Sequence, residues 1–183
     1  LVLREPERFT TYLALNIAHP WNTARTMGPH LWRFALYQPI MALAGRWLQQ
    51  RTPFLRILFR IAVKDRTNVS DADIALFADR FRDPVCARTG QQTYRTFLLH
   101  ELPALGRTPE SRRSTVRTVA LFGDQDTAIS EKLAAEETAN ADDYTLKLVP
   151  GAGHFIADER PELVRAEVEA LFASAARAGD AAA

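Results

Sequence analysis

The stretch that decides the fold is TVALFGDQD at residues 118–126, followed one helix and one strand later by LVPGAGHF at residues 148–155. Each segment is an apolar, strand-like run that ends in a glycine-containing loop. Each loop carries a side chain able to do chemistry, Asp126 in the first and His154 in the second. In open α/β sheets, functional groups gather in the crevice beyond the carboxyl ends of parallel strands. We therefore expect Asp126 and His154 to lie at that edge of a sheet.

The rest of the C-terminal half alternates between strand and helix patterns. An apolar run at residues 9–17, between two prolines, is expected to be a further buried parallel strand. The later elements expected are a strand at 115–122, a helix at 130–140, a strand at 144–149 and a helix at 161–173. This order predicts an α/β fold with parallel strands joined by crossover helices.

Residues 21–112 follow a different pattern, because their apolar positions recur at helical spacing. Ser70 followed by Asp73 has the form of a capping box, and Asp83-Pro84 places proline at a first helical position. We expect four segments in all: a core strand in 1–20, an all-helical insertion in 21–112, the second half of the core in 113–174 and a disordered tail in 175–183.

The composition excludes several kinds of partner. The 183 residues include 23 Lys and Arg against 22 Asp and Glu, so no charge excess favours nucleic acid or an anionic membrane. No apolar run approaches the roughly 20 residues that a membrane span requires. Cys86 is the only cysteine, which excludes an internal disulfide and fits a reducing cytoplasm. We expect a cytoplasmic protein that binds a small apolar or neutral organic substrate, in an oligomeric state that stays open.

Asp126 and His154 have the chemistry of a catalytic acid and base. A carboxylate that hydrogen-bonds one imidazole nitrogen fixes the tautomer in which the other nitrogen accepts a proton, and it stabilises the imidazolium that forms. General-base catalysis of this kind accelerates a reaction by about a hundred- to ten-thousand-fold. Asp124 is an alternative that could instead cap the following helix, whereas Asn16, at the end of the first strand, cannot act as a carboxylate.

The nucleophile of a catalytic triad is missing from the sequence. No Ser, Cys or Asp before Asp126 lies in a Gly-x-nucleophile-x-Gly turn. A metal site is not expected to replace it, because the four histidines lack the ligand spacing of a zinc site. We expect neither a metal nor an organic cofactor.

The chain resembles the C-terminal portion of an α/β-hydrolase-fold enzyme of the epoxide-hydrolase-like branch. The resemblance implies that Asp126 and His154 serve a nucleophile, Asp or Ser, that lies shortly upstream of Leu1. It also implies that the all-helical insertion is a lid over the active site. The motifs that carry the resemblance are PERF at 6–9, LALNIAHP at 13–20, FGDQD at 122–126, GAGHF at 151–155 and RPELV at 160–164.

Two lid tyrosines act as acids toward the epoxide oxygen in epoxide hydrolases. By resemblance, Tyr94-Arg95 matches the second tyrosine and its following arginine, and Tyr37-Gln38-Pro39 matches an aromatic-Gln-Pro segment. The first acid tyrosine is expected a few positions earlier, where this chain has Trp32, Arg33 and Phe34. Either Tyr37 serves as that acid, or the substrate is an ester, a haloacid or a C–C bond beside a carbonyl.

Other functions stay open at this point. The chain by itself is expected to be inactive as an enzyme and to expose strand edges. The alternatives are a non-catalytic remnant that binds a small molecule and an interaction scaffold. The open reading frame discriminates between them: codons upstream of Leu1 for a strand, Gly-x-Asp-x-Gly or Gly-x-Ser-x-Gly and a helix favour the enzyme, whereas a start codon at Leu1 favours the binding module.

Overall fold

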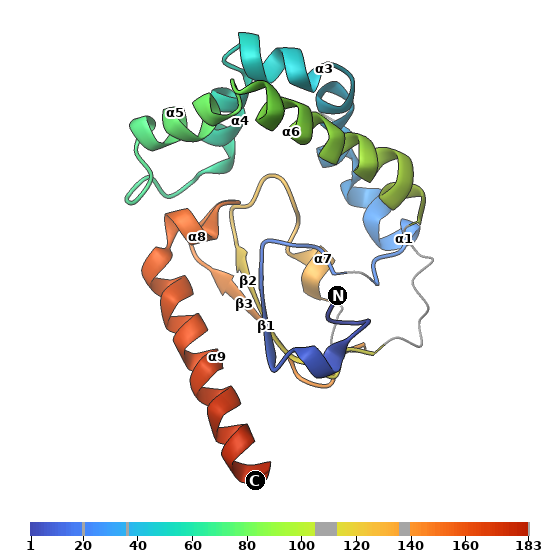
Figure 1. The fold of residues 1–183 in the computed structure, drawn as a ribbon, viewed down its shortest axis with the longest axis vertical. Helices are drawn as coiled ribbons and strands as arrows, with labels where there is room; N and C mark the ends of the chain where they lie inside the picture. Colours follow the sequence, from blue (N-terminus) through green and yellow to red (C-terminus); the bar gives the residue numbers. More distant parts are fainter. Residues whose placement is uncertain (20, 36, 105–112, 136–139, 183) are drawn as a thin grey trace.

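The computed structural model describes residues 1–19, 21–35, 37–104, 113–135 and 140–182. Its centre is a parallel three-stranded sheet in the order β1-β2-β3. The strands are β1 (Thr11–Leu15), β2 (Arg117–Gly123) and β3 (Tyr144–Val149), each within two residues of its expected bounds. The parallel pairing confirms the α/β prediction (Figure 1).

β2 is the middle strand, and all of its residues after the first are buried. A near-continuous apolar run suits such a strand because both of its faces are covered. On one face, Val119 and Leu121 pack with Val149 of β3 and Leu171 of α9 (Pro161–Ala182). Figure 1 shows α9 running along this side of the sheet.

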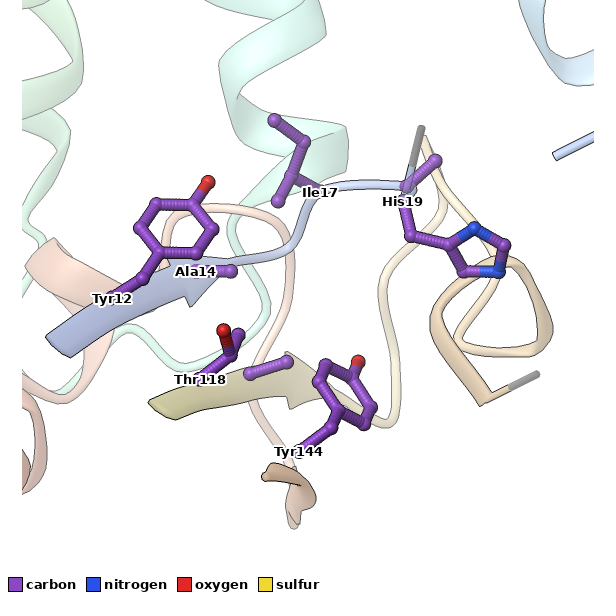
Figure 2. A pocket seen from close by; sticks show the side chains of 8 residues that line it. Tyr12, Ala14, Ile17, His19, Thr118 and Tyr144 are labelled. Atoms are coloured by element: carbon purple, nitrogen blue, oxygen red, sulfur yellow. The ribbon is translucent and has the colours of Figure 1, made fainter. Parts of the chain in front are cut away.

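The opposite face of the sheet carries the alternate residues of the strands. Here α7 (Lys132–Ala135) packs Leu133 against Met27, and Asn22 donates hydrogen bonds to the carbonyls of His19 and Leu133. Of the helix expected at 130–140, the structure describes α7, and residues 136–139 lie outside the described residues. A pocket of about 220 Å³ opens on the same face, and Figure 2 shows its lining by side chains of all three strands and of residues 17–19.

The residues between 24 and 104 form a layer of helices, as expected, and are called the helical layer below. A capping box begins α5 (Asp71–Arg80), where Ser70 Oγ accepts a hydrogen bond from the Asp73 amide. At the start of α6 (Pro84–Thr96), the Asp83 carboxylate accepts hydrogen bonds from two backbone amides. Figure 1 shows the layer at one end of the sheet. Its elements are α1 (Ala24–Met27), a 3-10 turn (Gly28–His30), α2 (Leu31–Ala35), α3 (Gln38–Arg51), α4 (Phe54–Ala62), α5 (Asp71–Arg80), α6 (Pro84–Thr96), a π-helical turn (Phe97–Glu101) and a 3-10 turn (Leu102–Ala104).

The C-terminal segment differs from the prediction of a disordered tail at 175–183. A short helix, α8 (Ile156–Glu159), leads into α9, which continues to Ala182. The segment is alanine-rich, and alanine has the highest intrinsic helix propensity, so the backbone stays helical although the sequence offers little to bury. Among the described residues, every helix is too short or too polar to cross a membrane.

Candidate active site

Asp126 follows β2 through a tight turn in which its amide donates to the Gly123 carbonyl at 3.1 Å. Its carboxylate is almost completely enclosed, with the side chain 1% exposed. Oδ1 accepts hydrogen bonds from the amides of Ala128 at 2.7 Å and Ile129 at 3.1 Å. Oδ2 lies 2.9 Å from Nδ1 of His154. The two amides hold the carboxylate in the orientation that meets the imidazole.

His154 lies on the loop that follows β3. Its amide donates to the carbonyl of Ala62 at 2.9 Å, and its ring packs edge-on against Phe155. Because Nδ1 faces a carboxylate, the favoured neutral tautomer carries its proton on Nδ1 and leaves Nε2 as the acceptor. Nε2 has no hydrogen-bond partner among the described residues, and the His154 side chain is 29% exposed. The arrangement can therefore take up a proton at Nε2.

Two glycines allow the loops of Asp126 and His154 to approach each other. A Cβ on Gly123 would lie 2.3 Å from the Gly153 carbonyl oxygen, and a Cβ on Gly153 would lie 2.2 Å from the Ala62 carbonyl oxygen. Neither position has room for a side chain. Gly151 adopts a φ of 72°, a conformation that glycine reaches without strain.

The two aspartates of the FGDQD segment have different partners. Asp126 contacts the histidine, whereas Asp124 Oδ1 accepts from the amide of Gly151 at 2.8 Å. Asp124 therefore holds the start of the histidine loop and does not compete for the imidazole. The sequence analysis favoured Asp126 over Asp124 as the acid, and Asp126 is the one of the two that contacts the imidazole. Its catalytic role stays a prediction.

Asn16 is a site residue whose contribution the sequence did not reveal. It is buried, has a φ of 45°, and lies directly after β1. Its Nδ2 donates to the carbonyls of Gly153 at 2.6 Å and His154 at 2.7 Å, and its Oδ1 accepts from the Gly123 amide at 2.8 Å. One amide side chain thus joins the ends of all three strands. Its position at a strand end is the signal in the sequence, which does not show that the amide bonds to the two other strand ends.

Two charged residues next to the pair were also missed. Arg33, on α2, donates from Nη1 to the backbone carbonyl of Asp126 at 3.0 Å, and its guanidinium lies 5.5 Å from the ring centre of Trp32. The helical layer therefore brings a positive charge next to the acid. Glu159 is fully buried behind the histidine loop. Glu159 stands beside Asp158 in the IADER segment, and the sequence gives no signal that separates the buried carboxylate from the exposed one.

Tyr37 and Tyr94 lie together in the helical layer, with ring centres 5.8 Å apart in an edge-on arrangement. Both pack around the buried side chains of Met41, Leu55 and Ala78. Burial raises the pKa of Tyr94 to about 12, with a smaller contribution from the neighbouring Tyr37 phenol. Among the described residues, no hydrogen bond or ring contact joins this tyrosine pair to Asp126 or His154. The structure brings the two tyrosines to each other, and their role toward a substrate remains a prediction.

The fold is similar to those of several solved hydrolases. An epoxide hydrolase from Bacillus megaterium matches with a TM-score of 0.72 and 16% identity, over 93% of this chain and 63% of that chain. A laboratory-evolved variant of potato epoxide hydrolase StEH1 matches with a TM-score of 0.71 and 13% identity, over 95% and 65%. The chain has a partial α/β-hydrolase fold.

A third similar structure is a C–C hydrolase of the same fold, 2-hydroxy-6-oxo-6-phenylhexa-2,4-dienoate hydrolase from Rhodococcus sp. strain RHA1. It matches with a TM-score of 0.66 and 16% identity, over 94% of this chain and 58% of that chain. The chain thus spans between 58% and 65% of the length of these hydrolases. No protein-family model and no curated protein matches the sequence. At these identities the similarity establishes the α/β-hydrolase fold alone, and the activity has to be inferred from the geometry of the site.

Proposed function

We propose that this chain supplies the acid and the base of an epoxide-hydrolase-like enzyme, with Asp126 as the acid and His154 as the base. The observation that carries the proposal is the 2.9 Å contact between His154 Nδ1 and the enclosed carboxylate of Asp126. The nucleophile, Asp or Ser, comes from a segment before residue 1. β1 pairs only with β2 among the described residues, so its other edge is available to a parallel strand that carries the nucleophile.

With an aspartate nucleophile, the reaction has two steps. The carboxylate attacks a saturated carbon of the epoxide, the C–O bond of the ring breaks, and an alkyl-enzyme ester forms. Nε2 of His154 then takes a proton from water as the water oxygen attacks the ester carbonyl. The ester C–O bond breaks, the leaving oxygen takes up a proton from the imidazolium, and the diol is released. Asp126 stabilises the imidazolium at this stage, because its carboxylate remains hydrogen-bonded to Nδ1.

The helical layer is proposed to be the lid, and Tyr94 and Tyr37 are proposed to donate protons to the epoxide oxygen. The raised pKa of Tyr94, about 12, keeps its phenol protonated at neutral pH. A protonated phenol can stabilise the alkoxide that develops as the ring opens, because an alkoxide is a much stronger base than a phenolate. The apolar surroundings of both tyrosines suit a small apolar or neutral organic substrate.

A second candidate is a serine-nucleophile hydrolase of the same fold that cleaves an ester or a C–C bond beside a carbonyl. One observation favours it: the helical layer presents Arg33, and not a tyrosine, to the backbone of Asp126. A haloacid dehalogenase would use the same acid and base, and a non-catalytic remnant would keep the fold without a nucleophile.

The discriminating experiment traps the covalent intermediate. The His154→Gln variant, expressed with its natural upstream segment, is incubated with a small aryl epoxide and analysed by intact mass spectrometry. A protein heavier by the mass of the epoxide supports aspartate chemistry, because hydrolysis of the ester requires the base. An adduct with an activated ester alone supports the serine nucleophile. If neither probe labels the variant or is turned over by the parent, the enzyme proposal is wrong.

A further inference from the structure

Glu159 places a completely buried carboxylate against four backbone amides. Oε2 accepts hydrogen bonds from the amides of Lys64 at 3.0 Å, Asp65 at 2.8 Å and Gly153 at 2.8 Å. Oε1 accepts from the amide of Phe155 at 3.1 Å. The residue is 0% exposed. A carboxylate is tolerated in the interior only when its oxygens accept hydrogen bonds, and here backbone amides donate them.

The charge of this carboxylate has no cation partner among the described residues. The adjacent arginine, Arg160, forms its ion pair with Asp65 and contacts the Pro150 carbonyl. Amide dipoles alone therefore stabilise the anion. A glutamine at this position would keep the shape but would present an NH₂ group where one carboxylate oxygen now accepts, so at least one donor would lose its partner.

Two of the four donors flank His154. The carboxylate holds Gly153 on one side of the histidine and Phe155 on the other, so it fixes the backbone from which the imidazole projects. The distance between Nδ1 and the Asp126 carboxylate depends on that backbone. Loss of the Glu159 contacts would let the imidazole turn away from its acid.

The other two donors belong to the helical layer. Lys64 and Asp65 lie in the connection between α4 and α5, and further contacts join this connection to the histidine loop. The His154 amide donates to the Ala62 carbonyl, and Asn68 Nδ2 donates to the Glu159 carbonyl at 3.1 Å. Glu159 is thus shared between the base and the layer above it.

We infer that Glu159 is a positioning residue that fixes His154 against Asp126 and couples the histidine loop to the connection between α4 and α5. Its importance for turnover rests on the proposed function, but the positioning itself does not. Among the described residues, the Glu159 carboxylate accepts hydrogen bonds from backbone amides and not from the imidazole, so it acts through the backbone on both sides of the base.

The test compares Glu159→Gln with the parent by NMR in the absence of substrate. In the variant, the amides of Gly153 and Phe155 are expected to exchange with solvent about ten- to a hundredfold faster, because each lost contact to a charged group exposes a donor. The Nδ1 proton of His154, hydrogen-bonded to Asp126 in the parent, is expected to lose its downfield resonance. Glu159→Asp retains the charge on a side chain one methylene shorter and is expected to recover part of both signals.

Leu171→Ala is the matched control for general destabilisation. Leu171 is buried in the apolar cluster between α9 and the sheet, which also contains Ala152 and Ile156, and its side chain has no hydrogen-bonding group. This control is expected to lower the melting temperature while leaving the Nδ1 proton and the exchange of Gly153 and Phe155 unchanged relative to global unfolding. Equal effects of Leu171→Ala and Glu159→Gln on those signals would overturn the inference, as would a Glu159→Gln variant with the signals of the parent.

If Glu159→Gln does not fold, the parent protein still decides the question. Hydrogen exchange of the amides of Lys64, Asp65, Gly153 and Phe155 is followed at constant pH, because all four donate to the same carboxylate. The inference predicts that the four amides are protected to a similar extent and become exposed in one opening event. Unrelated exchange rates would contradict it. Because no turnover is measured, the positioning role can fail while the proposed function stands, and the reverse is also possible.

Discussion

The acid–base pair and the tyrosine pair are held in place by different forces. Buried polar side chains position Asp126 and His154 by hydrogen bonds to the backbone, as Asn16 shows with three such bonds. Apolar packing around Met41 holds Tyr37 and Tyr94. Hydrogen bonds specify one geometry, whereas apolar packing tolerates substitutions of similar volume. The comparison indicates that hydrogen bonds specify one geometry at the strand ends, whereas the helical layer has more freedom to change its side chains.

The largest expected effect is on turnover. In the protein with its upstream segment, Asp126→Asn is expected to lower kcat about ten-thousand-fold, because an amide no longer selects the tautomer with a free Nε2 acceptor. Tyr94→Phe is expected to lower kcat far less, about a hundredfold at most, since a second phenol remains. Steady-state kinetics on both variants measures the contrast. Equal losses would mean that the two pairs do not differ in this way.

The close approach of the loops predicts the largest effect on stability. Gly153→Ala is expected to lower the free energy of unfolding by roughly 3 kcal/mol, because the added Cβ would overlap the Ala62 carbonyl oxygen and the backbone has to shift. Gly28→Ala is the matched control, since no atom lies within 4 Å of its Cβ position. The control is expected to change the free energy by about 0.5 kcal/mol or less. Urea denaturation of both variants measures the difference, and similar losses would contradict the packing seen here.

The Asn16 contacts predict a somewhat smaller loss. Asn16→Gly keeps a residue that tolerates the positive φ and removes the amide, so the free energy of unfolding is expected to fall by about 2 kcal/mol. Asn16→Ala is expected to cost about 1 kcal/mol more, because alanine is also strained at this φ. Thermal and urea melts separate the two contributions. An Asn16→Gly variant as stable as the parent would show that the amide does not hold the strand ends.

The tyrosine pair predicts a dependence on alkaline pH. The pKa of Tyr94 rises from 10.0 to about 12 in the folded protein, so the stability that its neutral phenol retains is fully present below pH 10.0 and is lost as the pH rises through about 12. The loss is expected to reach about 3 kcal/mol at most. Tyr94→Phe is expected to remove this component of alkaline unfolding, as measured by denaturant melts at increasing pH. An unchanged pH profile would contradict the burial of the phenol.

The smallest expected effect concerns the start of α5 in the helical layer. Ser70→Ala removes the hydroxyl that accepts from the Asp73 amide and is expected to lower the free energy of unfolding by about 1 kcal/mol. Turnover should stay at the level of the parent. A large loss of activity would show that the helical layer transmits local changes to the site more strongly than apolar packing allows.

The sequence predicted the strand ends well because the relevant signals are local. Apolar runs that end in glycine loops define β2 and β3, and the loops place Asp126 and His154 at one edge of the sheet. The capping box at Ser70 is equally local and is confirmed. In each case the decisive contacts lie within a few residues along the chain, or follow from the rule that parallel strands share an edge.

Other features depend on contacts between distant residues and could not be predicted. Asn16 bonds to residues more than a hundred positions away, and Glu159 reaches back to Lys64. A single sequence does not show which polar residue is buried when its partners are backbone groups elsewhere. The pairing of Tyr37 with Tyr94 likewise depends on how α3 packs against α6. The continuation of α9 to Ala182 was not expected from the low apolar content of the tail, since an alanine-rich segment can be helical with little to bury.

An NMR measurement of the two ring nitrogens of His154 at neutral pH, in the parent and in Asp126→Asn, tests the pairing of the imidazole with its carboxylate. In the parent, Nδ1 is expected to carry the proton and Nε2 to be the acceptor, and the variant is expected to lose this preference. A proton on Nε2 in the parent, or the same tautomer in both proteins, would contradict the pairing on which the proposed chemistry depends.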